Sequence, residues 1–284
     1  MEIIRAASEL KARLAALRKA GKIIGFVPTM GALHEGHLSL VKEAADHSDV
    51  VVMSIFVNPN QFNNASDLER YPRDLQKDAA LLEGTACELL FVPSVKEVYP
   101  EPDQRVFDFG DLDKVMEGKF RPGHFNGVAQ VVSRLFDLVA PHKAFFGEKD
   151  FQQLAVVRAM VRQLNYPVEI VPCPIVREAD GLAMSSRNML LSTLQRKNAP
   201  QIALTLSESC NFAATHSVAE TKQQVVDAIN AVPELEVEYF EIVDGNSLQA
   251  VGSWEESSYV VGCIAVFAGE VRLIDNVIYK NSMS

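Results

Sequence analysis

The sequence predicts an α/β protein, in which a doubly wound parallel sheet is followed by a smaller C-terminal α+β domain. The first observation is a series of short, continuous apolar runs, which are typical of parallel strands covered on both faces. The second is that segments with helical spacing separate these runs. The third is a change of pattern after Val176, where a loop comes first and a strand hairpin comes last. We therefore expect two domains, residues 1–176 and residues 177–284.

The chain opens with a predicted helix. Leu10, Leu14 and Leu17 recur at helical spacing, which indicates one buried face. Ser8 is a candidate N-cap, and Gly21 is a candidate C-terminal glycine.

Strands and crossover helices then alternate. Parallel strands are predicted at 22–27, 49–57, 88–92, 143–146 and 168–171, and helices at 75–82, 128–139 and 151–164. The first strand should end at Pro28, because proline cannot donate to a sheet ladder. Ligands of such sheets bind beyond the carboxyl ends of the strands, which is where Pro28, Asn58 and Gly147 fall.

The second domain has a different pattern. Helices are predicted from Thr193 and at 222–231, and strands at 237–243, 259–267 and 271–274. The residues 268–270 include a glycine and predict a hairpin turn between the last two strands. These elements indicate a small α+β domain.

Composition limits the classes of partner. The 284 residues carry a formal net charge of -10, whereas nucleic acid or an anionic membrane would require a basic surface. No apolar run approaches the roughly 20 residues that cross a bilayer, and the first residues lack the regions of a signal peptide. The four cysteines are far apart and are interpreted as reduced core thiols, with no metal cage. We expect a cytoplasmic protein that binds neither nucleic acid nor membrane.

The segment 28–37 is the most informative motif. It reads Pro-Thr-Met-Gly-Ala-Leu-His-Glu-Gly-His and joins a predicted strand to a helix that starts near Gly36. His34 and His37 are three residues apart, so they share one face if the helix has begun there. Free N–H groups and the positive end of the helix dipole gather at such a start. An anion is the expected ligand, and the triphosphate of ATP suits it.

A second motif strengthens this interpretation. The segment 184–187 reads Met-Ser-Ser-Arg and follows a loop that contains Asp180 and Gly181. A His-x-Gly-His turn followed later by a Met-Ser-Ser-basic loop is typical of enzymes that split ATP between its α and β phosphates. Each motif is weak alone, and the ordered pair is strong.

With three further motifs, the chain resembles the pantothenate synthetase (pantoate–β-alanine ligase) family over its whole length. The five matching segments are 28–37, 55–62, 121–125, 146–153 and 184–187. The resemblance implies a Rossmann-like nucleotidyltransferase fold, similar to that of class I aminoacyl-tRNA synthetases. One residue departs from the pattern, since Asn60 stands where the family's Asn-Pro-Met-Gln segment has methionine, and this puts local packing in doubt.

The resemblance also implies a reaction and its partners. (R)-Pantoate and β-alanine would be condensed to pantothenate at the expense of ATP, through a pantoyl adenylate, with release of AMP and pyrophosphate. Residues 1–176 would bind ATP and pantoate, and residues 177–284 would form a lid that excludes water. Mg²⁺ is expected with ATP, without a protein cage of acids, although Asp78 is a candidate neighbour of the metal. A homodimer is implied by the resemblance alone.

Charge development during adenylation points to the catalytic candidates. Negative charge accumulates on phosphate oxygens, which requires cationic and N–H partners held in advance. His34, His37, Lys149 and Arg187 are the candidates. With the resemblance, the ATP-binding set is Met30, Gly31, Ala32, Leu33, His34, Glu35, Gly36, His37, Gly147, Glu148, Lys149, Asp150, Val176, Met184, Ser185, Ser186 and Arg187.

Neutral amides are the candidates for pantoate. The pantoate carboxylate must stay nucleophilic, so amides can orient it and the two hydroxyls without neutralising its charge. Gln61 and Gln153 are assigned to pantoate, and by resemblance Gln61 also contacts β-alanine. Secondary candidates are Asn58, Tyr71, Arg121 and Asp150.

Two alternative functions fit the motifs less well. A nucleotidyltransferase of the same fold that transfers a nucleotide to a phosphorylated small molecule is disfavoured by the residues from Asn58 to Gln61 and by Gln153, and by the lack of basic groups for a second phosphate. A nucleotide-binding regulatory module without turnover would not need His34, His37 and Lys149 together with Arg187.

Overall fold

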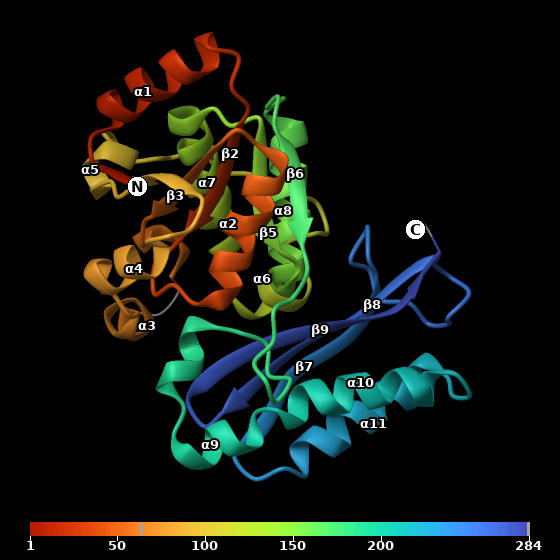
Figure 1. Ribbon diagram of the computed structural model, residues 1–284. Helices are drawn as coiled ribbons and strands as arrows, with labels where there is room; N and C mark the ends of the chain where they lie inside the picture. The colour runs from red at the N-terminus through yellow and green to blue at the C-terminus, as the bar shows by residue number, and fades with distance from the viewer. Residues whose placement is uncertain (63–64, 283–284) are drawn as a thin grey trace. The chain divides into compact units, whose positions relative to one another are not determined.

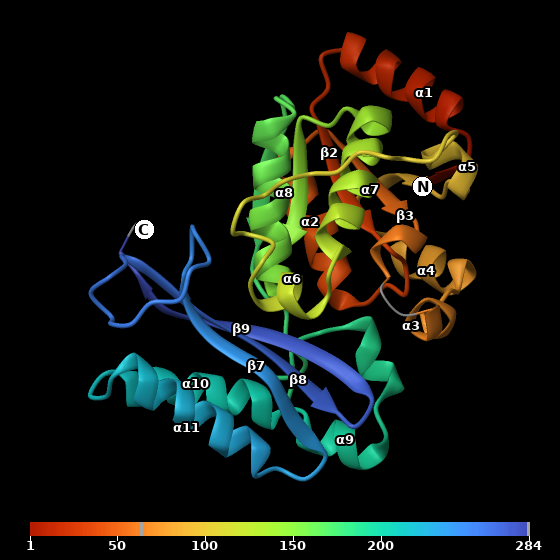
Figure 2. The same ribbon diagram turned by 180° about the vertical axis from the view of Figure 1, so that it is seen from behind.

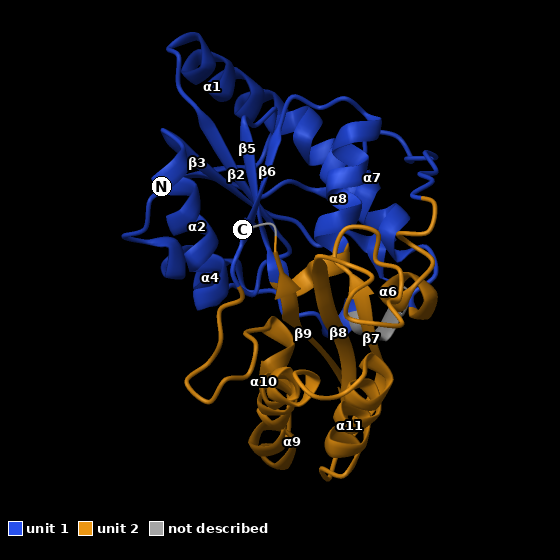
Figure 3. Cartoon of the chain, turned by 90° about the vertical axis from the view of Figure 1, so that its right-hand side faces the viewer, with its two compact units in different colours: residues 1–109, 121–148, 153–174 blue, residues 110–120, 149–152, 175–284 orange. Residues whose placement is uncertain are grey.

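The computed structural model describes residues 1–62 and 65–282, and all of their side chains except those of 65–67. The chain forms two compact units (Figure 3). Unit 1 comprises residues 1–109, 121–148 and 153–174, and unit 2 comprises residues 110–120, 149–152 and 175–284. Unit 2 therefore takes two short segments from the first part of the sequence.

A six-stranded sheet forms the centre of unit 1, as far as its residues are described. The strand order is β1-β4-β3-β2-β5-β6, and every neighbouring pair is parallel. The strands are β1 (Glu2–Ile4), β2 (Ile24–Thr29), β3 (Val50–Ile55), β4 (Cys87–Phe91), β5 (Lys143–Gly147) and β6 (Glu169–Cys173). The prediction of a parallel sheet is confirmed, with β1 as a strand that the sequence pattern did not indicate.

The strand β2 continues through Pro28, so the prediction that this proline ends the strand is wrong. Pro28 pairs with Ser54 of β3, whereas β5 pairs with β2 at Gly25 and Phe26, before the proline. Past Phe26 the strand is therefore paired along one side, and a residue without an N–H is tolerated there.

Helices cover both faces of this sheet. They are α1 (Ala7–Lys19), α2 (Glu35–His47), α3 (Ala65–Arg70), α4 (Leu75–Leu82), α5 (Val95–Val98) and α7 (His124–Val139), with α8 (Phe151–Gln163) starting in the segment 149–152. Buried residues of α2 and α4 join strand residues in one apolar cluster, and α2 lies in front of the sheet in Figure 1. Helix α7 lies on the opposite face (Figure 2), where Phe136 meets Phe26 edge-on at 6.3 Å between ring centroids.

The start of α1 differs from the prediction. Ala6 is the N-cap, and Ser8 lies inside the helix without capping it. The carboxylate of Glu97 accepts a hydrogen bond from the Ala7 N–H at 2.6 Å instead. A partner 90 residues away thus replaces the local cap, while Gly21, with φ of 76°, ends the helix as predicted.

The strand order reverses between β2 and β5. The chain runs from β2 to β3 and β4 on one side, and then to β5 and β6 on the other. Doubly wound sheets bind ligands at the carboxyl ends of the strands beside such a reversal. The segment 30–34 follows β2 and Gly147 ends β5, so two of the predicted motifs begin at this point.

Unit 2 is an α+β structure with an antiparallel sheet. Its described residues form three strands in the order β7-β8-β9. The elements are α6 (Met116–Phe120), α9 (Thr193–Asn198), α10 (Gln201–Ala213), α11 (Val218–Asn230), β7 (Leu235–Asp244), β8 (Tyr259–Ala268) and β9 (Val271–Asn281). The hairpin turn predicted at 268–270 is confirmed but is two residues long, because Ala268 still belongs to β8 and Gly269, with φ of 59°, begins the turn.

Helices α10 and α11 supply the core of unit 2. Leu206 and Val225 from these helices join Phe240 and Ile264 from the strands in one buried cluster. Both helices lie along the same face of the sheet in Figures 1 and 2. The predicted smaller α+β domain is therefore confirmed as a fold class.

A buried ionic network holds the segment 110–120 in unit 2. Glu117, at the start of α6, forms an ion pair with Arg272 of β9 at 2.6 Å and accepts a hydrogen bond from the Tyr239 hydroxyl at 2.8 Å. The Gln152 amide donates to two carbonyls of the same segment, those of Leu112 and Val115. These partners are far apart in sequence, which is why the sequence pattern did not reveal the segment's place.

The cysteines are free thiols, as expected. Desolvation raises the pKa of Cys87 to about 11 and the pKa values of Cys173 and Cys263 to about 12. These thiols stay protonated at neutral pH and are poor nucleophiles. Among the described residues, no helix has both the length and the apolar character needed to cross a bilayer.

Candidate active site

His34 and His37 lie together at the start of α2. His34 is the N-cap, and its Nδ1 accepts a hydrogen bond from the Gly36 N–H at 3.2 Å. The His34 N–H donates to Nδ1 of His37, also at 3.2 Å. The ring centroids are 4.1 Å apart. This reciprocal arrangement satisfies two N–H groups of the first turn and fixes both rings.

The hydrogen bonds also determine which ring nitrogen carries the proton. Since each Nδ1 accepts a backbone N–H, the neutral imidazoles of His34 and His37 carry their protons on Nε2. Nδ1 of each ring therefore belongs to the helix cap, and both rings lie at the N-terminus of α2, the positive end of its dipole.

A buried carboxylate holds the loop between β2 and α2. Asp78 of α4 is 2% exposed, and its two oxygens accept the N–H groups of Ala32 at 3.0 Å and Leu33 at 2.8 Å. Gly31 has φ of 85°, and a Cβ there would lie 3.0 Å from an Asp78 oxygen. The loop therefore needs a glycine at this position. Asp78 acts as an anchor for the loop, a role that the sequence did not suggest.

Gln61 is held beside the same loop. Its side chain is in the short η1 helix (Pro59–Gln61), is 9% exposed, and donates to the Met30 sulfur at 2.8 Å. The Gln61 carbonyl is 2.9 Å from Nδ1 of His124, at the start of α7. Both the backbone and the side chain of this glutamine are thus held by other parts of the protein.

Asn58 supports Gln61 from behind. It is fully buried, and its amide donates to the Gly127 carbonyl at 3.1 Å and to the Gln61 amide oxygen at 3.4 Å. The Tyr99 hydroxyl donates to the Asn58 oxygen at 3.2 Å. Asn60, the departure from the family pattern, has an exposed side chain, so it does not disturb this packing.

The remaining secondary candidates of unit 1 have less direct places. Tyr71 is buried and packs edge-on against Phe62, with ring centroids 5.8 Å apart. Tyr71 thus lies against the residue that follows Gln61. Arg121 is half-buried and lies just before α7, the helix whose His124 contacts the Gln61 carbonyl.

Gln153 lies in the first turn of α8 and is half-buried. Among the residues that the structure describes, its amide has no hydrogen-bond partner, so it is available to a ligand. No hydrogen bond joins Gln153 to Gln61 within that same part of the chain. Glu148 follows Gly147 at the end of β5 and is half-buried.

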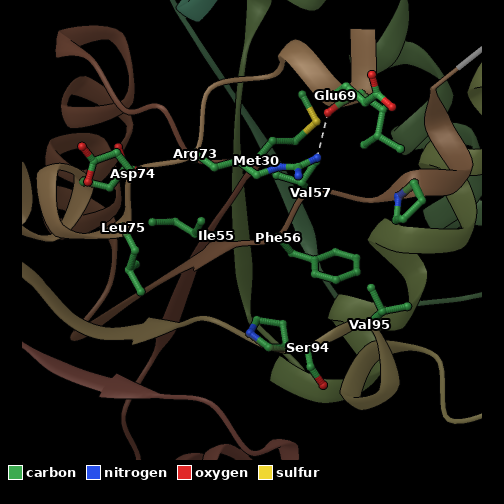
Figure 4. Close-up of a pocket in the computed structure, with 15 residues that line it drawn as sticks. Met30, Ile55, Phe56, Val57, Glu69, Arg73, Asp74, Leu75, Ser94 and Val95 are labelled. Carbon is green, nitrogen blue, oxygen red and sulfur yellow. Dashed lines mark hydrogen bonds between the residues drawn. The ribbon is translucent and has the colours of Figure 1, made fainter. Parts of the chain in front are cut away.

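A pocket of about 570 Å³ opens next to the loop at Met30 and Gly31 (Figure 4). Its lining is mostly apolar and comes from the ends of β2 and β3 and from α3, α4 and the start of α5. Arg73, on one side, donates to the Leu68 carbonyl at 2.8 Å, and the Asp78 oxygens are bonded to the loop. The histidine pair is not part of this lining. The sequence pattern did not predict the pocket.

In unit 2, Lys149 is held through its main chain. Its side chain is 18% exposed, and Nζ lies 3.9 Å from an oxygen of Asp150, a weak ion pair at the edge of the usual range. The Lys149 carbonyl accepts a hydrogen bond from the Asn276 amide at 3.1 Å. Asn276 belongs to β9, far along the chain.

The segment 184–187 begins the short helix η3 (Ser186–Leu190). Ser185 is the N-cap, and its hydroxyl accepts the Arg187 N–H at 3.3 Å. Ser186 is 8% exposed. The Met184 N–H donates to the Val176 carbonyl at 3.0 Å, so these two predicted ATP residues are joined by their backbones.

The structure thus gathers the predicted residues in two groups. Unit 1 joins the histidine pair and the loop 30–33, and places Gln61 against Met30. Unit 2 joins Val176 to the segment 184–187 and ties Lys149 to β9. Within residues 1–62 and 65–282, no three His, Cys, Asp or Glu side chains form a group that could hold a metal ion.

A doubly wound parallel sheet, with a cap of two histidines at the helix after its central strand, defines an α/β nucleotide-binding enzyme. Comparison with known proteins identifies the family. The profile of the pantoate-beta-alanine ligase family matches residues 2–278, so the chain belongs to that family.

Individual relatives agree over their full lengths. The chain is 60% identical to the pantothenate synthetase of Bacteroides fragilis (strain YCH46), over 99% of this chain and 100% of that protein. The crystal structure of pantothenate synthetase from Thermus thermophilus is similar with a TM-score of 0.92 and 47% identity, covering 99% and 100% of the two chains. The Francisella tularensis pantoate-beta-alanine ligase was solved with β,γ-ATP and β-alanine. It is similar with a TM-score of 0.80 and 33% sequence identity, covering 100% of both chains.

These findings confirm the predicted family, the Rossmann-like fold and the predicted function, a ligase that joins pantoate to β-alanine.

Proposed function

We propose that this ligase forms a pantoyl adenylate from ATP and (R)-pantoate at the switch point of unit 1, and then transfers the pantoyl group to β-alanine. The observation that carries this proposal is the histidine cap, in which backbone N–H groups bonded to each Nδ1 hold both imidazoles at the N-terminus of α2. Use of ATP and β-alanine is supported by the Francisella tularensis relative, which was solved with both kinds of ligand.

The chemistry has two steps. An oxygen of the pantoate carboxylate attacks the α-phosphorus of ATP, and the bond from that phosphorus to the bridging oxygen of pyrophosphate breaks. The amine of β-alanine then attacks the acyl carbon, AMP leaves, and the amine nitrogen loses a proton to form the neutral amide. The first step requires donors at the departing pyrophosphate, because charge accumulates there.

The donors are assigned to the predicted catalytic residues. His34 and His37 donate from Nε2 to phosphate oxygens, and Lys149 adds a positive charge. Arg187 binds two phosphate oxygens with its planar guanidinium, beside the hydroxyls of Ser185 and Ser186. The loop 30–33 and the residues 35–36 and 147–150 line the nucleotide, and Val176 and Met184 complete the ATP contacts.

Gln61 and Gln153 are assigned to pantoate, and Gln61 also to β-alanine. The Gln153 amide has no protein partner among the described residues, and the Gln61 amide is paired with the weak acceptor Met30 and the adjoining Asn58. An amide without a partner can form a hydrogen bond to a ligand, and an amide with a weak partner can replace that bond, at little cost in free energy. Such amides leave the carboxylate its charge, which the first step needs.

Mg²⁺ would accompany ATP as part of the substrate. The described residues contain no cluster of acids, and the Asp78 oxygens are bonded to backbone N–H groups. Phosphate oxygens and water would therefore supply most of its ligands, as Mg²⁺ commonly has in nucleotide sites. The ion would neutralise phosphate charge during adenylation.

Several broader assignments belong to the same proposal. Residues 1–176 bind ATP and pantoate, and residues 177–284 act as a lid that contributes phosphate contacts. The enzyme works in the cytoplasm, an assignment that the free thiols support. It binds neither nucleic acid nor membrane, which the net charge of -10 supports. A homodimer rests on the family resemblance, and light scattering coupled to gel filtration tests it.

An exchange assay tests the proposed order of chemistry. The protein is incubated with ATP, pantoate, Mg²⁺ and labelled pyrophosphate, without β-alanine. A pantoyl adenylate that forms first returns label into ATP. A preparation that makes pantothenate and AMP from all three substrates but shows no exchange would exclude the adenylate-first order.

A further inference from the structure

Two neighbouring polar residues of β9 are buried in unit 2. Asp275 is 4% exposed and Asn276 is 6% exposed. Buried polar groups are expensive unless they are hydrogen-bonded, so the partners of these side chains show what the pair does. The partners belong to the two segments of unit 2 that carry the predicted phosphate ligands.

Asn276 reaches the first of these segments. Its amide donates to the carbonyl of Lys149 at 3.1 Å, across 127 residues of sequence. This hydrogen bond holds the backbone of the residue that carries the Lys149 amine. Asn276 therefore influences where that amine is placed without touching it.

Asp275 reaches the second segment. Its carboxylate forms a bidentate pair with Arg177, with distances of 2.7 and 3.0 Å, and the carboxylate is 3% exposed. Arg177 Nη1 also donates to the Gly181 carbonyl at 3.1 Å. The planar fork of arginine makes such pairs geometrically specific.

The loop that Asp275 holds leads directly into the predicted ATP motif. Arg177 and Ala183 form an antiparallel bridge, and the next residue, Met184, bonds to the Val176 carbonyl at 3.0 Å. The Asp275 carboxylate also accepts the Asn276 N–H at 2.8 Å, which joins the two residues into one arrangement. One strand thus holds both phosphate-binding segments of unit 2.

We propose that Asp275 and Asn276 are positioning residues that set the spacing between Lys149 and the segment 184–187, and so match these groups to the ATP phosphates. Adjacent positions on a strand are separated by roughly 3.3 Å and are held by the sheet ladder, which makes β9 a rigid reference. A displacement of about 1 Å in a catalytic group can cost on the order of 10²-fold in rate. The proposal rests on the proposed phosphate roles of Lys149 and Arg187.

The central test replaces Asn276 by alanine in the full-length protein. Asn276→Ala should slow pyrophosphate exchange and raise the KM for ATP, so that kcat/KM for ATP falls by about tenfold. The reason is the loss of the hydrogen bond that positions Lys149. The KM for β-alanine should change little, so the loss is specific to ATP even where the thermal midpoint falls with the lost buried hydrogen bond. Asn211→Ala is the matched control, because Asn211 is exposed on α10 of the same unit.

A double variant shows whether Asn276 acts through Lys149. In a Lys149→Ala background, Asn276→Ala should have almost no further effect on exchange, since the group that it places is gone. If the two effects multiply instead, Asn276 has an independent, general structural role and the proposal is overturned. Equal losses in the kinetics of all substrates with a lowered thermal midpoint would overturn it as well.

The same series separates this inference from the proposed function. If Lys149→Ala leaves exchange unchanged, the phosphate role of Lys149 itself is wrong. If Lys149→Ala slows exchange but Asn276→Ala does not, only the positioning role is wrong. Should Asn276→Ala fail to fold, Asn276→Ser takes its place, because a serine hydroxyl is too short to restore the bond to Lys149.

Arg177→Lys tests the other half of the arrangement. Lysine keeps the positive charge beside Asp275 but cannot form the bidentate pair or reach the Gly181 carbonyl in the same geometry. The KM for ATP should rise about threefold to tenfold at a nearly constant KM for β-alanine, as expected for one lost hydrogen bond. An unchanged KM for ATP would show that this loop needs no anchor on β9.

Discussion

The predicted phosphate ligands are held locally in unit 1 and from a distance in unit 2. The two histidines of unit 1 cap their own helix, each bonded to a residue at most three positions away. In unit 2, Lys149 and the loop before 184–187 are held by β9, at sequence separations of 127 and 98 residues. A local cap forms as soon as its helix forms, whereas the β9 contacts require the folded sheet.

This difference has a consequence for mutations. Substitution of His34 or His37 should affect the reaction directly. Substitutions far from this pair should have little effect on it, because adjacent backbone groups fix the two rings. Changes in unit 2 should be transmitted from β9 to the residues that we propose bind ATP.

Lys149→Ala should have the largest effect. Loss of one preorganised charge at the departing phosphates should slow adenylation by about 10²–10³, while the fold is retained. Single-turnover formation of the adenylate, followed by quenched flow, measures the effect. A variant with a native circular dichroism spectrum and a wild-type rate would remove Lys149 from the mechanism.

His37→Ala should slow pyrophosphate exchange and overall synthesis together, by on the order of 10²-fold, because a donor to the departing pyrophosphate is lost. His47→Ala is the control, since His47 lies at the other end of the same helix and contacts the Glu43 carbonyl. A loss of synthesis with normal exchange would move His37 from the first step to the second.

Asp78→Asn should raise the KM for ATP by about tenfold and destabilise the protein by about 1–3 kcal/mol, because one buried loop N–H loses its acceptor. Asp74→Asn is the matched control on α4, since asparagine caps a helix as well as aspartate does. The free energy of unfolding in urea and the kinetics are measured on both variants. Equal behaviour of the two would show that the loop does not depend on Asp78.

Gln153→Ala should have the smallest effect, an increase of about fivefold to tenfold in the KM for pantoate with a smaller change for ATP, as expected for one neutral hydrogen bond. Gln163→Ala, at the far end of α8, is the control. A proportional increase for both substrates would indicate a general defect instead of a pantoate contact.

The contrast between the two units also explains which features were predictable. The strands at 49–57 and 143–146 and the helix at 75–82 were predicted because continuous apolar runs and helical spacing are local signals. Pro28 was misjudged because its tolerance depends on which side of β2 is paired, and Ser8 because Glu97 caps α1 instead. Neither fact is present in the local sequence.

The sequence by itself determined the family, the reaction and the chemical types of the candidate ligands, because five motifs keep their order and spacing along the chain. It also placed His34 and His37 near the start of a helix, whereas their capping hydrogen bonds became visible only in the structure. Only the tertiary structure decided that Asp78 anchors the loop 30–33, that Asn58 supports Gln61, and that β9 holds Lys149 and Arg177. The physical reason is that buried polar groups must find partners wherever the fold places them, and those partners need not be neighbours in sequence.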